Sequence, residues 1–154
     1  MRRFNRLCLF FLLLNGCHNM AFRPPSPEQV NYFSFRGKTF QAVSCRIYDG
    51  DTFSSVFQYG EEWIKWRCRC MGYDAPEIRQ PRHLSEVVRQ EEKKKAFAAR
   101  DRLFELLTRT DTIHIQCGDF DKYGRILVTV YSTGFLQESI NDLMIRDGHG
   151  LPLL

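Results

Sequence analysis

The 154-residue sequence lacks several features that define whole classes of protein. It contains no internal repeats, which excludes solenoid and propeller architectures. Its apolar run from Leu7 to Leu14 is too short to cross a bilayer as an ordinary helix, which needs about 20 residues. The Cys68-x-Cys70 pair has no second pair and no histidine nearby, so a zinc site is not indicated.

A strong excess of charge of one sign is also missing. The chain has 22 basic and 18 acidic residues, a formal net charge of +4. Three of the basic residues, Arg2, Arg3 and Arg6, precede the apolar run, and no acidic residue occurs before position 20. The rest of the chain is nearly neutral, so net charge identifies no partner. With 44% hydrophobic and 26% charged residues, the composition is that of a soluble globular domain.

Residues 1–20 are typical of a signal or hydrophobic leader. Three arginines followed by a short apolar run form the usual order of an export signal. Leu14-Asn15-Gly16-Cys17 also resembles a bacterial lipoprotein signal, in which the cysteine becomes a lipidated N-terminus. An uncleaved apolar segment is the alternative. The leader predicts a secreted protein, or one attached to a membrane through its N-terminal segment.

The other cysteines favour a different compartment. Cys45, Cys68, Cys70 and Cys117 each lie in a strand-like segment with apolar neighbours. This pattern predicts four buried, reduced thiols, because a free cysteine behaves as a small hydrophobe. Reduced thiols suit a reducing compartment, so an intracellular location is the alternative.

Sequence patterns predict a single domain over residues 38–154, preceded by a proline-rich linker over residues 21–37. The first three strand-like segments predict an antiparallel meander. The five strand-like segments are residues 39–47, 52–58, 63–71, 112–117 and 126–132.

A long helix is predicted between the third and fourth strands. Ser85 is a suitable N-cap, and the helix is expected to end near Leu107. A second, short helix is expected over residues 136–146. Three strands, a helix, two strands and a helix form the order of a five-stranded Greek-key barrel, the OB-fold, in a mainly β, α+β class. Apolar residues recur at helical spacing in the long helix at Ala96, Ala99, Leu103 and Leu106.

Two carboxylates are expected at one rim of this barrel. Asp51 begins the second strand after a turn, and Asp74 follows the third strand. Together with a backbone carbonyl they would suit an oxygen-preferring cation, calcium first. Taken alone, Asp49-Gly50 is an ordinary turn signal, because this dipeptide is favoured in hairpins for backbone reasons.

Two arginines are the candidates for binding a phosphate. Arg69 lies in a strand between two cysteines, where a guanidinium is costly unless it meets an anion. A structural ion pair with Asp51 or Glu77 is the alternative. Arg125 stands at the entry to the fifth strand, and two arginine forks could grip one phosphate.

Three segments together resemble the staphylococcal nuclease (thermonuclease) family. They are Ile47-Tyr48-Asp49-Gly50-Asp51-Thr52, Arg69 through Asp74-Ala75-Pro76-Glu77, and Asp121-Lys122-Tyr123-Gly124-Arg125. They occur in the family's order over roughly residues 38–150. The arginine five positions before the aspartate of Asp-Ala-Pro-Glu is the most specific mark.

The resemblance implies a monomeric OB-fold endonuclease that uses Ca²⁺. Such an enzyme hydrolyses DNA and RNA without sequence specificity, favours single strands and leaves 3′-phosphate ends. The alternative is an inactive member of the family that binds nucleic acid or protein. The sequence ends at Leu154, before the family's third helix and its substrate-stacking tyrosine, which puts the stability of the domain in question.

The resemblance also implies a role for each motif residue. Calcium would be held by Asp51, Asp74 and the Ala75 carbonyl, and Glu77 would orient or deprotonate the attacking water. The phosphate undergoing attack would be neutralised by Arg69 and Arg125, and the nucleotide's terminal phosphate would contact Lys122 and Tyr123.

Overall fold

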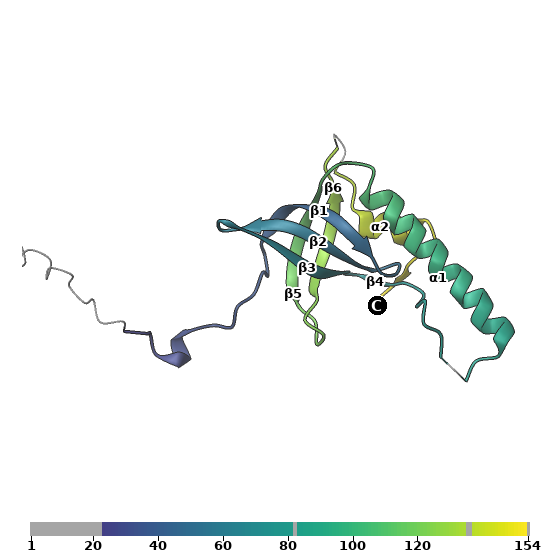
Figure 1. Ribbon diagram of the computed structural model, residues 1–154, viewed down its shortest axis with the longest axis horizontal. Coiled ribbons are helices and arrows are strands. Elements are labelled where there is room, and N and C mark those ends of the chain that lie inside the picture. Colours follow the sequence, from purple (N-terminus) through teal and green to yellow (C-terminus); the bar gives the residue numbers. More distant parts are fainter. Residues whose placement is uncertain (1–22, 82, 135–136, 154) are drawn as a thin grey trace, which may run out of the picture. The chain divides into compact units, whose positions relative to one another are not determined.

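The computed structural model describes residues 23–81, 83–134 and 137–153 (Figure 1). The chain divides into two compact units, residues 1–33 and 34–154. The described part of the first unit contains one 3-10 helix, η1 (Pro27–Gln29). The predicted leader, residues 1–20, lies outside the described residues. The second unit begins at Ser34, and Phe35 is part of its core.

The second unit is built on a closed five-stranded barrel, as predicted. The barrel has the order β1-β2-β3-β6-β5, and β5 closes it by pairing with β1. Within the barrel, β3 and β6 pair in parallel and the other neighbouring strands pair antiparallel. The mainly β, α+β class and the OB-fold architecture are therefore confirmed. The strands are β1 (Thr39–Ile47), β2 (Thr52–Tyr59), β3 (Glu62–Cys70), β5 (Ile113–Phe120) and β6 (Ile126–Ser132).

Two helices pack beside the barrel (Figure 1). Helix α1 (Glu86–Leu107) begins after Ser85, whose hydroxyl accepts a hydrogen bond from the Val88 N–H. The four predicted apolar positions of α1 are all buried, and Leu107 joins them. Helix α2 (Ile140–Arg146) begins four residues later than expected, because Ser139 caps it. No helix among the described residues is both long and apolar enough to cross a membrane.

A second sheet of two short strands lies at the end of the domain and was not predicted. Strand β4 (Tyr73–Asp74) pairs with β7 (Leu151–Pro152), and the Leu153 N–H donates to the Gly72 carbonyl over 2.9 Å. Gly150 lies against the Tyr73 ring so closely that an added Cβ would be 2.4 Å from Tyr73 Cδ2. The segment after α2 therefore fixes the strand that carries Asp74.

The prediction of four buried thiols is wrong for Cys45. This residue is exposed, because a bulge between Ser44 and Arg46 removes it from the regular alternation of β1. Cys68, Cys70 and Cys117 are buried and free, as predicted. Burial raises the pKa of the Cys68 and Cys70 thiols to about 12, so both remain protonated.

Gly50 is needed for close packing rather than for its backbone conformation. Its φ is not among the positive values, so the backbone explanation of the Asp49-Gly50 turn is wrong. A Cβ at this position would lie 2.6 Å from Ala75 Cβ and 2.7 Å from Ala99 Cβ. The turn before Asp51 is thus pressed between α1 and the loop that follows β4.

We expect Ala99→Leu to destabilise the domain by about 1–3 kcal/mol, because overpacking must displace this turn. Ala98→Leu is the matched control, since Ala98 is exposed on the same helix and should change stability by less than about 0.5 kcal/mol. Denaturant unfolding of the two variants measures the difference. Equal losses would contradict the close contact between α1 and the turn.

Candidate active site

The candidate site converges on Arg69. Its neighbours Cys68 and Cys70 point into the core, so strand alternation places Arg69 on the opposite face of β3. Its Nη2 lies 3.1 Å from Asp51 Oδ2 and also pairs with Asp74 Oδ1. One guanidinium therefore neutralises two carboxylates, one from the turn before β2 and one from β4. Of the two ion-pair partners considered from the sequence, Asp51 is the one present.

Asp51 is the buried member of this cluster, with a residue exposure of 3%. Its Oδ1 accepts a hydrogen bond from the Thr52 hydroxyl over 2.7 Å, and its Oδ2 accepts a long one from the Ala75 N–H over 3.5 Å. Burial raises the pKa of Asp51 to about 6, although the Thr52 hydrogen bond and the charge of Arg69 act to lower it. The positive charge and hydrogen bonds around the Asp51 carboxylate therefore do not offset the cost of burying its charge.

Arg125 joins the same network through Thr52. Its Nη1 donates to the Thr52 hydroxyl over 3.0 Å, and that hydroxyl donates onward to Asp51. Its Nε donates to Asp121 Oδ2 over 2.6 Å, which fixes the guanidinium. Burial acts to raise the pKa of Asp121, but hydrogen bonds from Arg125 and Tyr123 outweigh it and hold the pKa below its usual range. A continuous chain of contacts therefore runs from Asp121 to Asp74.

Lys122 and Tyr123 lie beside Arg125 in the turn between β5 and β6. Tyr123 is 64% exposed, and Lys122 Nζ and Arg125 Cζ lie 5.1 Å and 5.5 Å from the centroid of its ring. The Trp66 indole N–H donates to the Gly124 carbonyl over 2.8 Å and ties this turn to β3. Both cations are therefore close to one exposed aromatic ring.

Glu77 is the predicted site residue that the structure does not connect to the others. It is exposed in the loop after β4, and within the described part of the chain its carboxylate makes no hydrogen bond or ion pair. Ala75, two residues earlier, is half-buried and contacts Asp51 through its N–H. The structure thus brings Arg69, Arg125, Asp51 and Asp74 together, with Ala75 at their edge.

Three residues that support the site had no role in the sequence analysis. Thr52 bridges Arg125 and Asp51, Asp121 holds Arg125, and the buried Tyr73 hydroxyl donates to the Gly50 carbonyl over 2.9 Å. All three lie inside the motif segments quoted from the sequence, but only the folded chain shows that Tyr73 contacts Gly50.

A family model described as staphylococcal nuclease homologue matches residues 67–151, just over half of the chain. The chain belongs to the staphylococcal nuclease family. The matched range includes Arg69, Asp74 and Arg125, whereas Asp51 and Thr52 precede it. A search of curated proteins found no match.

The family generally depends on calcium, and the donors at this rim fit such an ion in part. Asp51 and Asp74 both reach one cationic nitrogen of Arg69, so their oxygens converge on a place that already attracts positive charge. Hard cations such as calcium prefer carboxylate and carbonyl oxygens. Among the described residues no group of three or more histidine, cysteine, aspartate or glutamate side chains is arranged to hold a metal ion. An ion held by Asp51 and Asp74 would therefore take its other ligands from carbonyl, water or substrate oxygens.

We expect Asp51→Asn to stabilise the calcium-free protein at neutral pH. The folded-state pKa of Asp51, about 6, exceeds the value of about 4 in an unfolded chain, so folding favours the protonated form. Wild-type stability therefore falls as the pH rises from about 4 to about 6, and the variant lacks this loss. Urea unfolding with chelator should show a gain of about 1–3 kcal/mol at pH 8 and none below pH 4.

Asp101→Asn, at an exposed position of α1, is the matched control for this experiment. Calcium should raise the unfolding midpoint of the wild type and of this control. It should raise the midpoint of Asp51→Asn much less, because that variant lacks one of the proposed ligands. A wild type that is more stable than Asp51→Asn at pH 8 in chelator would show that burial of the carboxylate carries no cost.

Proposed function

We propose that this chain is a calcium-dependent endonuclease that hydrolyses phosphodiester bonds of DNA and RNA without sequence specificity and leaves 3′-phosphate ends. The observation that carries the proposal is the network that links Arg69 and Arg125 through Thr52 and Asp51. Two guanidiniums at one rim suit a phosphate that gains negative charge in the transition state. Family membership supports the same chemistry.

Asp51 and Asp74, with the Ala75 carbonyl, would hold the calcium ion, which when bound supplies positive charge that polarises the phosphoryl group. Arg69 and Arg125 would donate to the non-bridging phosphate oxygens. Asp121 keeps Arg125 in place, since it accepts from both its side chain and its backbone N–H. Lys122 and Tyr123, beside Arg125, would bind the nucleotide's terminal phosphate.

Glu77 would orient the attacking water and accept its proton. The water oxygen would bond to phosphorus as its proton passes to Glu77, and the bond from phosphorus to the 5′ oxygen would break. The 5′ oxygen would leave with the bonding electron pair and take a proton from solvent, which gives a 5′-hydroxyl beside the 3′-phosphate. An exposed carboxylate without a partner among the described residues is free to bind a water. The same isolation favours a second candidate function, an inactive family member that binds nucleic acid or protein without cleaving it.

We further propose that residues 1–20 export the enzyme, or attach it to a membrane if Cys17 is lipidated. Three buried, protonated thiols are equally compatible with an intracellular enzyme that keeps its leader. The mass of the protein isolated from its natural host separates cleaved, lipidated and intact forms. An intact chain in the cell interior would overturn the export proposal.

Cleavage by this protein should depend on calcium. The purified protein should degrade heat-denatured DNA and RNA when calcium is present and stop when a chelator is added. End-group analysis of the products should find 3′-phosphates. Cleavage that continues in chelator would contradict the proposed mechanism, and binding without any cleavage would favour the inactive module.

Substitution of Glu77 or Arg69 should slow the chemical step. Glu77→Gln should lower kcat by about 10²–10⁴-fold, because it removes the proton acceptor. Arg69→Lys should lower kcat by about 10²–10³-fold, since lysine keeps the charge beside both carboxylates but loses the fork. Single-turnover rates on a short labelled oligonucleotide measure both effects.

Arg79→Ala is the matched control, because Arg79 is exposed two residues after Glu77 and lies outside the set of proposed site residues. It should leave the rate within about twofold. Glu77→Gln should also unfold like the wild type, since Glu77 is exposed. Wild-type rates in Glu77→Gln would remove Glu77 from the reaction.

A further inference from the structure

Four residues of β3 form one row on the outer face of the barrel. They are Trp63, Lys65, Arg67 and Arg69. Strands β2 and β3 pair without a register shift from Thr52↔Arg69 to Tyr59↔Glu62, so alternate residues of β3 share a face. Cys68 and Cys70, of the opposite set, are buried in the core. This row, named here the β3 row, ends at the candidate active site.

Two of the three cations of the β3 row are not neutralised by any described residue. Lys65 and Arg67 are both exposed, and neither makes an ion pair within the described residues. Their partners on β2, Val56 and Ser54, are uncharged. On the far side of Ser54 lies Arg46 of β1, which is also exposed and stacks at 4.8 Å on the Tyr48 ring. Lys65, Arg67 and Arg46 therefore form an exposed positive patch, and the β2 residues paired with them carry no carboxylate. Such a patch favours binding of a polyanion.

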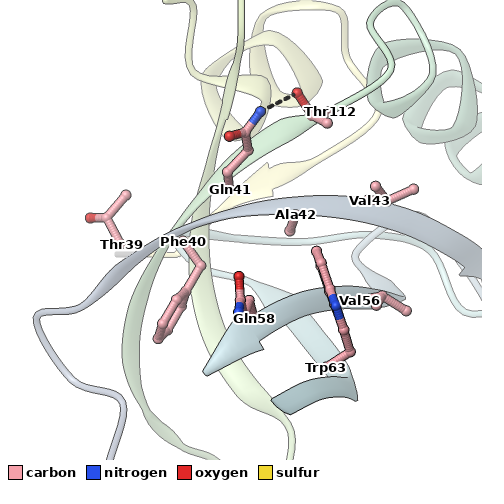
Figure 2. Close-up of a pocket in the computed structure, with 9 residues that line it drawn as sticks. All are labelled: Thr39, Phe40, Gln41, Ala42, Val43, Val56, Gln58, Trp63 and Thr112. Carbon is pink, nitrogen blue, oxygen red and sulfur yellow. Dashed lines mark hydrogen bonds between the residues drawn. The ribbon is translucent and has the colours of Figure 1, made fainter. Parts of the chain in front are cut away.

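The end of the row farthest from Arg69 carries an aromatic side chain. Trp63 is 70% exposed, although a tryptophan usually buries most of its ring. It borders a hollow of about 430 Å³ that also exposes the side chains of Gln41, Val43 and Gln58. Figure 2 shows the Trp63 indole standing between Gln58 and Val56 of β2 and reaching toward β1. An exposed indole beside amide groups can stack on a nucleobase and bond to its edge.

We infer that the β3 row is a track for a single-stranded polynucleotide. The phosphates of the strand lie along Arg67 and Lys65, one base stacks on Trp63, and the phosphate to be cleaved lies at Arg69. The placement of the cleaved phosphate at Arg69 rests on the proposed function, whereas the contacts with Lys65, Arg67 and Trp63 do not. A duplex is disfavoured, because its bases are already stacked and cannot turn onto Trp63.

The length of the track sets a testable size for the ligand. Arg69 lies six residues after Trp63 along β3, which corresponds to about 20 Å at 3.3 Å per residue. A dinucleotide at Arg69 cannot span this distance, whereas an oligonucleotide of roughly 12 nucleotides lies within the site sizes known for OB-folds. Loss of Trp63 should therefore matter for long ligands and not for short ones.

The first test measures binding of fluorescent 12-nucleotide DNA and RNA strands of equal sequence, with chelator present so that no cleavage occurs. Lys65→Gln/Arg67→Gln should weaken binding of both and reduce the slope of log affinity against log salt by about 1.4, or 0.7 per lost phosphate contact. Lys93→Gln/Lys94→Gln, on the exposed face of α1, removes the same charge and should leave affinity and slope unchanged.

The second test replaces the indole. Trp63→Ala should lower affinity for the 12-nucleotide strands by about 5- to 100-fold, which is the range for loss of one base–aromatic stack. Trp63→Phe should restore most of it. Because Trp63 is exposed, neither substitution should change the stability of the fold, and thermal unfolding of both variants checks this. Cleavage of a dinucleotide substrate should be the same in both variants and in the wild type.

The outcomes separate the track from the proposed nuclease. If the wild type cleaves and all track variants bind as the wild type does, the track is wrong and the proposed nuclease activity is retained. Absence of cleavage together with the predicted losses of binding supports the track on a protein that is not a nuclease. Variants that lose binding to vesicles of phosphatidylserine, but keep binding to the oligonucleotides, overturn the track in favour of a membrane surface.

Discussion

The buried carboxylate of Asp51 is the constraint on which the rim of this barrel depends. A carboxylate out of contact with water is costly unless charge and hydrogen bonds compensate it. Arg69, the Thr52 hydroxyl and the Ala75 N–H supply what compensation there is, and the raised pKa of Asp51 shows that it is incomplete. A rim that tolerates an undercompensated anion is well suited to receive a cation.

Elements far apart in the sequence hold this carboxylate in place. Gly50 lets the preceding turn pack against Ala99 of α1, and the Tyr73 hydroxyl binds the Gly50 carbonyl. Tyr73 is itself held by Gly150, which leads into β7. The long helix and the short final strand therefore act on the same turn from two sides. Their packing, rather than the local sequence around Asp51, determines where its side chain lies.

The sequence predicted the elements whose signals are local. The Ser85 cap and the apolar stripe of α1, and the five barrel strands, follow from spacing alone. The sequence did not predict features that depend on long-range contacts. Two-residue strands such as β4 and β7 have no periodicity, and the bulge that exposes Cys45 depends on how β1 pairs with β2. The sequence placed the motif residues in three separate segments, but the role of Thr52 required the register that sets it opposite Arg69.

Charge is arranged differently at the rim and along β3, and the difference has a physical reason. At the rim each guanidinium faces a carboxylate, so Arg69 and Arg125 are fixed before any ligand arrives. Such pairing orders the side chains at the cost of much of their attraction for a distant anion. Lys65 and Arg67 are unpaired by the described residues, so they attract a polyanion at long range but hold it loosely. Capture and precise positioning thus fall to different residues of one strand, since no single arginine can be both neutralised and unpaired.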